Sequence, residues 1–391
     1  MTPMQTPGQI QNSQPPRPSG RGRSRRGPMV LVGASVRAAA ESARMAGFSP
    51  IAVDHYGDRE TLAAALRWYR LDDFLDSGQP RPLDCTVPEP APIAIVGGLQ
   101  GGYGWIGPTR LPFFGASPEQ FLTCDRPEFL SDLAARAAVR FPETRCSGAA
   151  IRGWLVKRRG SSGGLGVSYS AGVGDIPENT ILQRPVRGRI CGASFFGLGD
   201  RAILLGVCRL LKKRIGPHPF VFAGAVGPIP LNAALVESLR RLGNALCCVS
   251  PLLGPFNIDV VLHHDAVTLL EVNPRWSASM ELVERAWGAA WDEPCSMFDG
   301  SADWIRRLEQ VPPGRADARP WNHAFVKRVL FARSDRRVVA ADFDRQGGGA
   351  AHWVWKDVPQ RPTDVRRHEP LATLIAPLQR MSLRQAFRVM V

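Results

Sequence analysis

Residues 256–286 read FNIDVVLHHDAVTLLEVNPRWSASMELVERA, and two β-type patterns lie in the first half of this stretch. Apolar residues alternate over residues 258–262, and a second run rich in β-branched and apolar residues covers 267–272. The polar residues His263-His264-Asp265 between the two runs are a turn signal. Together these patterns predict a β-hairpin, although its turn lacks the favoured Asn-Gly pair.

Three oxygen-bearing side chains lie on this predicted hairpin. Asp259 is on the first strand, and Glu271 and Asn273 are on one side of the second, because side chains two residues apart on a strand face the same way. Folding the hairpin brings Asp259 close to both of them, and Arg275 follows within reach of the same anion. Mg²⁺ prefers carboxylates together with phosphate oxygens, so the hairpin predicts a magnesium–nucleotide site.

A structural role for the same residues is also open, because an acidic residue followed by Asn-Pro is an ordinary turn signal. The position of Glu271 favours the metal site, since this residue lies within an apolar strand. We expect it to be buried there, and a buried carboxylate without a cation would be costly.

Composition sets broad limits on the class of protein. The chain has 391 residues, 44% hydrophobic and 21% charged, which is typical of a folded protein with two or three domains. The net charge is +14, and residues 1–27 are too rich in Pro, Gly, Ser, Gln and Arg to form a core. The eight cysteines form no CxxC pairs, which argues against a metal finger. No membrane span or apolar signal region is seen, so a cytoplasmic location is expected.

Strand and helix patterns alternate after this leader. Apolar runs at residues 28–33, 50–54 and 91–97, with an Ala-rich helix pattern at 34–47, predict a parallel α/β layer. The first strand-to-helix turn lacks the second and third glycines of a dinucleotide-binding motif, so NAD binding is not expected there. The glycine-containing loop at 97–108 is a candidate substrate-facing loop.

A glycine- and serine-rich loop follows a predicted strand in residues 153–166, GWLVKRRGSSGGLG. Backbone amides of such a loop can bind phosphate oxygens, and Lys157 at the strand end adds a point charge. This is not a Walker loop, because the lysine precedes the glycines and no GK[ST] follows. A flexible hairpin tip explains the same residues equally well.

Residues 180–186 predict a further strand that contains Gln183, whose amide could bind the amino edge of adenine. Three β-rich runs over residues 189–226 then predict an antiparallel sheet. The basic residues 212–214 are expected between two of these runs, either as a phosphate contact or as a solvated turn.

Lys157 with its glycine loop, Gln183 and the hairpin that begins with Asp259 occur in a fixed order. With EVNPRWSASMELVERA in the last place, this order resembles the ATP-grasp superfamily. It is most similar to the predicted carboxylate–amine ligase branch linked to tetrahydromethanopterin and one-carbon metabolism, which includes tyramine–glutamate ligases. The similarity covers residues 29–331.

The resemblance implies a fold of mixed α/β and α+β type: an N-terminal Rossmann-like pre-ATP-grasp domain and two α+β lobes with ATP between them. The implied division is a basic leader, the pre-ATP-grasp domain, a small lobe with the glycine loop, a catalytic lobe and a C-terminal strand with a basic extension. Their boundaries are residues 1–27, 28–125, 126–190, 191–310 and 311–391.

The resemblance also assigns roles to individual residues, with ATP as the nucleotide and Mg²⁺, or alternatively Mn²⁺, as the metal. The phosphates are expected on Lys157, Ser161, Ser162, Gly163, Gly164 and Gly166, and the adenine on Gln183 and the backbone of Val186. The metals are expected on Asp259, Glu271 and Asn273. The implied catalytic residues are Arg275 and Lys157.

The implied activity is ATP-dependent joining of a carboxylate to an amine through an acyl phosphate. Three departures from the family pattern bear on it. The ribose-binding acid is missing from residues 186–190, and an upstream lysine is missing from 140–152, where Arg145 or Arg152 is the candidate substitute. Asn257 stands where some relatives have an arginine.

Two other functions therefore remain open: a non-catalytic ATP-binding regulatory protein, and a nucleic-acid-associated protein that uses its arginine-rich ends. The expected partners are small-molecule carboxylate and amine substrates. Nucleic acid is the less favoured partner, no membrane partner is expected, and a homodimer is left open.

Overall fold

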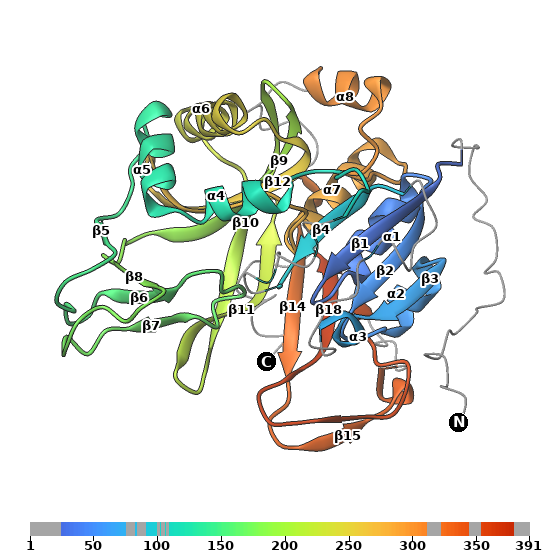
Figure 1. Cartoon of the computed structure of the whole chain (residues 1–391). Coiled ribbons are helices and arrows are strands. Elements are labelled where there is room, and N and C mark those ends of the chain that lie inside the picture. Colours follow the sequence, from blue (N-terminus) through green and yellow to red (C-terminus); the bar gives the residue numbers. More distant parts are fainter. Residues whose placement is uncertain are drawn as a thin grey trace.

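The computed structural model describes residues 25–75, 83, 91–99, 102, 106, 109–310, 322–343 and 353–378. Most of the leader at residues 1–27 and most of the candidate loop at 97–108 lie outside these ranges, so the expectations for them stay predictions. Figure 1 shows the N-terminal layer in blue on one side of a large central sheet and a small green sheet on the other.

The N-terminal residues form the parallel α/β layer that the alternating pattern predicts. Its sheet has the order β3-β2-β1-β4, and β1 pairs in parallel with both β2 and β4. The apolar strands β1, β2 and β4 are almost wholly buried, as expected for parallel strands covered on both faces. The elements are β1 (Pro28–Gly33), α1 (Arg37–Met45), β2 (Ser49–Asp54), α2 (Arg59–Ala64), β3 (Arg67–Arg70), α3 (Asp72–Leu75) and β4 (Ile93–Gly97).

A small antiparallel sheet with the strand order β5-β8-β6-β7 follows two short helices. The first helix starts with a capping box between Ser117 and Gln120, and the second has Pro127 in its first turn, where a missing N–H costs nothing. The elements are α4 (Pro118–Cys124), α5 (Pro127–Arg136), β5 (Thr144–Arg145), β6 (Leu155–Arg158), β7 (Val167–Tyr169) and β8 (Thr180–Gln183).

The central sheet has eight strands in the order β13-β12-β9-β10-β11-β14-β18-β16. The antiparallel sheet predicted over residues 189–226 is confirmed as its β9, β10 and β11. The strands are β9 (Arg189–Leu198), β10 (Ala202–Ile215), β11 (His218–Gly227), β12 (Leu253–His263), β13 (Ala266–Asn273), β14 (Phe325–Phe331), β16 (Val354–Lys356) and β18 (Pro370–Pro377).

Helices cover part of this sheet on both faces, so neighbouring residues of one strand enter different cores. Phe195 on β9 packs in a cluster with the buried leucines of α6 (Ala233–Val249). Phe196 packs in the other cluster, with α7 (Met280–Trp291) and α8 (Ala302–Glu309). This alternation is the period of two that a strand imposes on its side chains.

The described residues after 311, where one strand was expected, form five strands. Besides β14, β16 and β18, the strands β15 (Arg336–Val338) and β17 (Thr363–Val365) pair with each other next to η3 (Ala340–Phe343). Within the described ranges, no helix is both long and apolar enough to span a membrane.

Candidate active site

The predicted hairpin is confirmed as β12 and β13, which pair antiparallel through a tight turn. His264 in this turn has φ +50°, so the turn closes without the glycine that usually supplies a positive φ. Asp259 is the register partner of Glu271, and Asn257 is the partner of Asn273. The four polar side chains therefore form two adjacent cross-strand pairs.

The expectation that Glu271 is buried is wrong. Glu271 is exposed, whereas Asp259 is half-buried. Glu271 lies on the face of β13 that is open to solvent, opposite the face that packs Val267, Leu269 and Val272 in the core. The burial argument for a cation therefore fails, and support for a metal site rests on the pairing of the two carboxylates.

Neighbouring amides hold the two carboxylates in place. Asn257 Nδ2 donates to Asp259 Oδ1 at 2.7 Å, and Asn273 Nδ2 donates to Glu271 Oε1 at 3.1 Å. Arg275 Nη2 in turn donates to Asn273 Oδ1 at 2.9 Å. The amide of Asn273 is thus oriented from both ends, with its oxygen on the Arg275 side.

Arg275 also connects the hairpin to the N-terminal layer. Its Nη1 donates to the carbonyl oxygen of Val96 at 3.2 Å and to Ser277 Oγ at 3.1 Å. The guanidinium packs against Gly97, where an added Cβ would lie 2.5 Å from Cζ of Arg275. Gly97 also has φ +121°, so both backbone conformation and space require glycine at this position.

Lys157 on β6 lies within electrostatic reach of both carboxylates, although it belongs to the other sheet. Burial lowers the pKa of Lys157, and the charges of Glu271 and Asp259 act in the opposite direction. At Glu271, desolvation would raise the pKa, but the positive charge of Lys157 lowers it. The pKa of Glu271 therefore stays below its usual value. Lys157 is thus near the hairpin carboxylates, and its predicted role in binding phosphate stays a prediction.

The two carboxylates titrate as an interacting pair. Desolvation and the neighbouring charge of Glu271 raise the pKa of Asp259 well above its usual value, while Glu271 remains the ionised member. A divalent cation between them would favour ionisation of both, because metal ligands must be deprotonated. Proton release on metal binding is the expected consequence.

The glycine loop (residues 159–166) connects β6 to β7 and lies against β11 of the central sheet. The N–H of Phe222 donates to the carbonyl oxygen of Gly163 at 2.8 Å. Gly164 has φ +77°, and a Cβ there would lie 2.0 Å from the carbonyl oxygen of Phe220. The loop is thus a hairpin tip that packs beside β11. The predicted phosphate-binding role of its serines and glycines stays a proposal.

Gln183 is buried at the end of β8, where its Nε2 donates to Thr144 Oγ1 at 3.0 Å. Because the amide nitrogen of Gln183 donates to a residue of the small sheet, its side-chain carbonyl oxygen is the atom suited to accept a hydrogen bond from an adenine amino group. Val186 lies three residues further, in the segment that joins the small sheet to β9. Gln183 thus ends β8 and Val186 lies in the connection between the two sheets, and their adenine-binding role stays a prediction.

Of the two candidate substitutes for the missing upstream lysine, Arg145 is already engaged. Its Nη2 donates to Glu143 Oε1 at 2.9 Å, and its guanidinium lies 5.4 Å from the ring centre of Trp154. Arg152 is exposed on the small sheet unit.

Lys212 is the residue of this site that the sequence pattern missed. Residues 212–214 were expected between strands, but they belong to β10 (Ala202–Ile215). Burial and the nearby charge of Lys157 lower the pKa of Lys212 to about 8, and Asp259 and Glu271 oppose this shift. Lys212 therefore faces the same site from the central sheet, with its Nζ 4.4 Å from the ring centre of Phe220.

We expect Lys212 to react with trinitrobenzenesulfonate with a midpoint near pH 8, whereas an ordinary lysine titrates near ~10.4. The folded state disfavours the charged amine, so this destabilising contribution is present below about pH 8 and disappears as the pH rises toward ~10.4. Labelling against pH, mapped by mass spectrometry of a chymotryptic digest, measures the midpoint. In Lys212→Arg the labelled peptide should disappear, which assigns the signal to Lys212. A labelling midpoint above pH 10 in the native protein would contradict the lowered pKa of Lys212.

Among the described residues, no group of three or more His, Cys, Asp and Glu side chains is placed to hold a metal ion. The donor set of the hairpin is smaller: it consists of two carboxylates, because the amide of Asn273 directs its nitrogen to Glu271 and its oxygen to Arg275. Such a hard oxygen set suits Mg²⁺, which usually takes one or two carboxylates and completes its shell with water and substrate phosphates.

Comparison with known proteins agrees with this arrangement. Residues 125–279 match the family model described as the ATP-grasp domain. A carbamoyl phosphate synthase large chain of Mycobacterium sp. (strain JLS) is 26% identical over 151 residues, which are 37% of this chain. The match spans 14% of the length of that relative.

Two solved structures show the likeness over most of the chain. Phosphoribosylamine–glycine ligase of Thermotoga maritima is 14% identical, with a TM-score of 0.61 over 93% of this chain and 96% of its own. The biotin carboxylase domain of Hydrogenobacter thermophilus 2-oxoglutarate carboxylase was solved as a dimer with MgADP, ADP and bicarbonate. It is 11% identical, with a TM-score of 0.58 over 89% of this chain and 86% of its own.

The chain has the ATP-grasp fold. The family-model match, together with these structures, supports its place in the ATP-grasp superfamily.

Proposed function

We propose that this protein is an ATP-dependent ligase that activates a substrate carboxylate as an acyl phosphate and joins it to an amine. The observation that carries the proposal is the convergence of Lys157 and Lys212 on the Asp259–Glu271 pair. Lys157 of the small sheet and Lys212 of the central sheet lie near two carboxylates of the β12–β13 hairpin, an arrangement suited to a metal-bound polyphosphate. The names of the structural relatives, a ligase and a carboxylase solved with MgADP, agree with it.

In this proposal Asp259, Glu271 and Asn273 hold Mg²⁺, which when bound neutralises charge on the phosphate oxygens. Lys157 and Lys212 bind the phosphates from the two sheets, and the glycine loop encloses them. Gln183 and the backbone of Val186 bind adenine at the connection between the sheets. Arg275 lies at the hairpin end, where it would stabilise the charge on the acyl phosphate and on the departing phosphate.

The chemistry consists of two displacements. A carboxylate oxygen of the substrate attacks the γ-phosphorus, and ADP leaves with the electrons of the broken P–O bond. The amine then attacks the acyl carbon, phosphate leaves, and the amine nitrogen loses a proton. The protein contributes mainly position and positive charge, because phosphoryl transfer needs little covalent help from side chains.

For the substrates, we propose the carboxylate–amine ligase branch linked to one-carbon metabolism. The resemblance of residues 271–286 to that branch is the support for this finer assignment. Glutamate as the carboxylate and an aromatic amine such as tyramine are therefore the first pair to test. Acceptor pockets are built by variable loops, so the fold by itself does not select the substrate.

An isotope experiment tests the proposed reaction. Candidate carboxylates labelled with ¹⁸O are incubated with the protein, MgATP and a panel of amines, and the phosphate and organic product are analysed by mass spectrometry. Joining through an acyl phosphate transfers one ¹⁸O from the carboxylate to phosphate for each amide formed. ADP release without this transfer would contradict the acyl-phosphate route. ATP binding without any turnover across the panel would instead support the regulatory alternative.

A further inference from the structure

A broad pocket of about 1100 Å³ lies on the central sheet, away from the hairpin carboxylates. It is lined by the start of β9 and by parts of β10, β14, β16 and β18, with residues 333–336 at one end. Lys157, Asp259, Glu271 and Asn273 are not among its lining residues, whereas Lys212 is. The pocket is therefore next to the candidate active site but does not include it.

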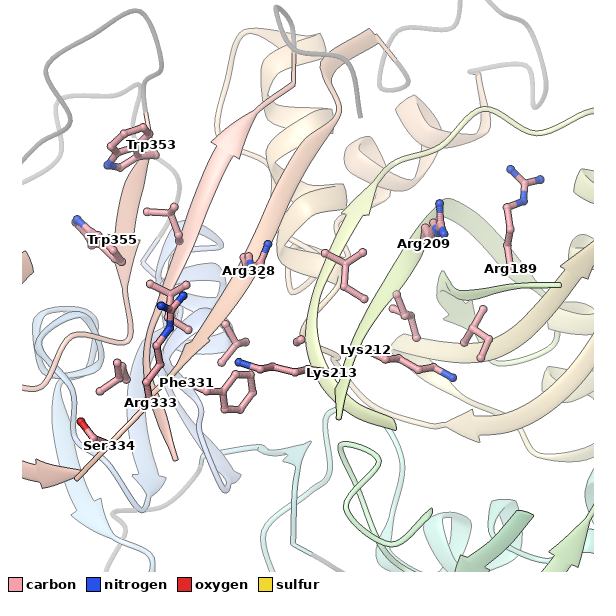
Figure 2. A pocket seen from close by; sticks show the side chains of 18 of the residues that line it. Arg189, Arg209, Lys212, Lys213, Arg328, Phe331, Arg333, Ser334, Trp353 and Trp355 are labelled. Atoms are coloured by element: carbon pink, nitrogen blue, oxygen red, sulfur yellow. The ribbon is translucent and has the colours of Figure 1, made fainter. Parts of the chain in front are cut away.

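The charged side chains that line this pocket are all positive. Besides Lys212 they are Arg189, Arg209, Lys213, Arg328, Arg333 and Arg336, and no aspartate or glutamate is among the lining residues. Figure 2 shows Lys213 directed toward Phe331 and Lys212 directed the opposite way; Lys213 Nζ lies 5.2 Å from the ring centre of Phe331. Arg336 has an acidic neighbour, with Nη2 3.8 Å from Asp342 Oδ2.

Arg189, Arg209 and Arg328 form no ion pair within the part of the chain that the structure describes. Strand pairing brings them together. Arg209 is the register partner of Cys191, so Arg189 lies two residues along the neighbouring strand, a diagonal of roughly 7–8 Å between Cα atoms. Arg328 is two strands from β10, in one row with Gly224 and Leu211, which puts its Cα roughly 12 Å from that of Arg209. The charges of Arg189 and Arg209 repel each other at their shorter distance, and an anion would remove that repulsion.

The chain does not supply this anion from its ends. Residues 1–24 and 379–391 contain arginines and no aspartate or glutamate. Residues 344–352, which precede β16, contain one aspartate and one arginine, so their charges cancel. A second copy of the chain packed face to face would bring a second set of cations against the first. The charge of the pocket therefore points to a different, acidic partner.

The remaining lining residues indicate what else this partner carries. Leu211, Leu330 and Leu374 give the pocket an apolar floor, and the aromatic rings of Phe331, Trp353 and Trp355 line it. Arginine binds phosphate through two parallel hydrogen bonds, and aromatic rings bind nucleobases by stacking. Five of the seven cations are arginines, a composition that suits phosphates better than isolated carboxylates.

We infer that this pocket binds single-stranded nucleic acid, with phosphates on the arginines of β9, β10 and β14 and bases against the apolar and aromatic surface. This departs from the expectation that nucleic acid is the less favoured partner, and it does not depend on the ends of the chain. It is also independent of the proposed ligase reaction, since it uses cations that lie outside the hairpin site.

The test is fluorescence anisotropy of a fluorescein-labelled 12-nucleotide oligo(dT) with the full-length protein at several salt concentrations. The variants are Arg209→Glu, Arg328→Glu and the two combined. Arg240→Glu is the matched control, because Arg240 is exposed on α6, does not line the pocket and changes the net charge equally. We expect each single variant to weaken binding about tenfold and the control less than threefold. Loss of two phosphate contacts should reduce the slope of log K against log salt by about 1.4.

Three outcomes would overturn the proposal: no binding of the oligonucleotide by the native protein, equal weakening by Arg240→Glu, or no weakening by the pocket variants. Competition with polyglutamate of matched charge separates the two classes of polyanion. If polyglutamate displaces the oligonucleotide at equal charge concentration, the pocket binds acidic peptide and the base-stacking part of the inference is wrong. Circular dichroism of each variant, with ADP release where substrates are known, verifies that the fold is intact.

Discussion

Glu271→Ala is expected to reduce Mg²⁺-dependent ADP release by about 100-fold or more, because it removes the carboxylate that stays ionised in the hairpin pair. Asp259, whose pKa is raised well above its usual value by burial and by Glu271, would then be the only carboxylate left on this pair of strands to bind the cation. ADP release measured against Mg²⁺ concentration should show both a lower maximum and a higher half-saturating concentration of metal.

A matched control uses Glu237, an exposed glutamate on α6 that is absent from the hairpin. Glu237→Ala should leave both parameters within twofold of the native values, and circular dichroism should be unchanged in both variants. If Glu271→Ala released ADP at the native rate, Glu271 would not be a metal ligand. The proposed chemistry would then lose its main support.

Glu281→Ala is expected to lower the free energy of unfolding by about 3–5 kcal/mol, because buried Lys327 would lose its carboxylate partner and buried Arg37 would keep only Glu41 and Asp357. Arg37 Nη1 lies 2.5 Å from Glu281 Oε1, and Lys327 Nζ lies 2.8 Å from Glu281 Oε2. Arg37 is 1% exposed and Lys327 4%, so neither charge can reach water without local opening. Urea unfolding, with the midpoint and slope fitted separately, measures the change.

The same carboxylate makes this effect depend on pH. Although burial opposes ionisation, Arg37 and Lys327 hold the pKa of Glu281 well below its usual value. The contribution to stability is therefore complete above the pKa of the unfolded chain, ~4.3, and is lost as the pH falls through the lower pKa of the folded state. The difference between native protein and Glu281→Ala should shrink on acidification below about pH 4.

Glu293, whose exposed side chain pairs with Arg307, is the control for this prediction. Glu293→Ala should cost less than about 1 kcal/mol, since exposed ion pairs contribute little. Replacing Glu281 and Lys327 together by methionine should recover part of the lost stability, because Lys327 is then not left unpaired and Arg37 keeps Glu41 and Asp357. A loss below 1 kcal/mol in Glu281→Ala would show that these cations find other partners.

The network around Glu281 also has a structural consequence for the site. Glu281 lies in the first turn of α7, two residues after the Ser279 N-cap, and Arg275 precedes this helix by only a few residues. Arg37 belongs to α1 of the N-terminal layer and Lys327 to β14 of the central sheet. The contacts of Glu281 thus hold the segment that carries Arg275 against both layers.

Several features followed from local patterns alone. Alternation of apolar residues predicted β12 and β13, and the spacing of Glu271 and Asn273 predicted that they share a face. The glycines after Lys157 predicted a loop, and apolar runs separated by an Ala-rich segment predicted the parallel N-terminal layer. Each of these depends on interactions among residues within a few positions of one another, which sequence periodicity records directly.

Other features were decided only by tertiary structure. Glu271 is exposed because no other element covers its face of β13 at this point, and an apolar run does not reveal which face a neighbour will cover. Lys212 faces Lys157 only because β10 extends beyond the predicted strand and the glycine loop folds onto β11. The basic pocket joins residues of β9, β10 and β14 that are distant in sequence, so no local pattern could predict it. Sequence determined which side chains each strand presents, and the packing of the sheets determined which of them meet, because contacts between distant strands depend on the whole fold.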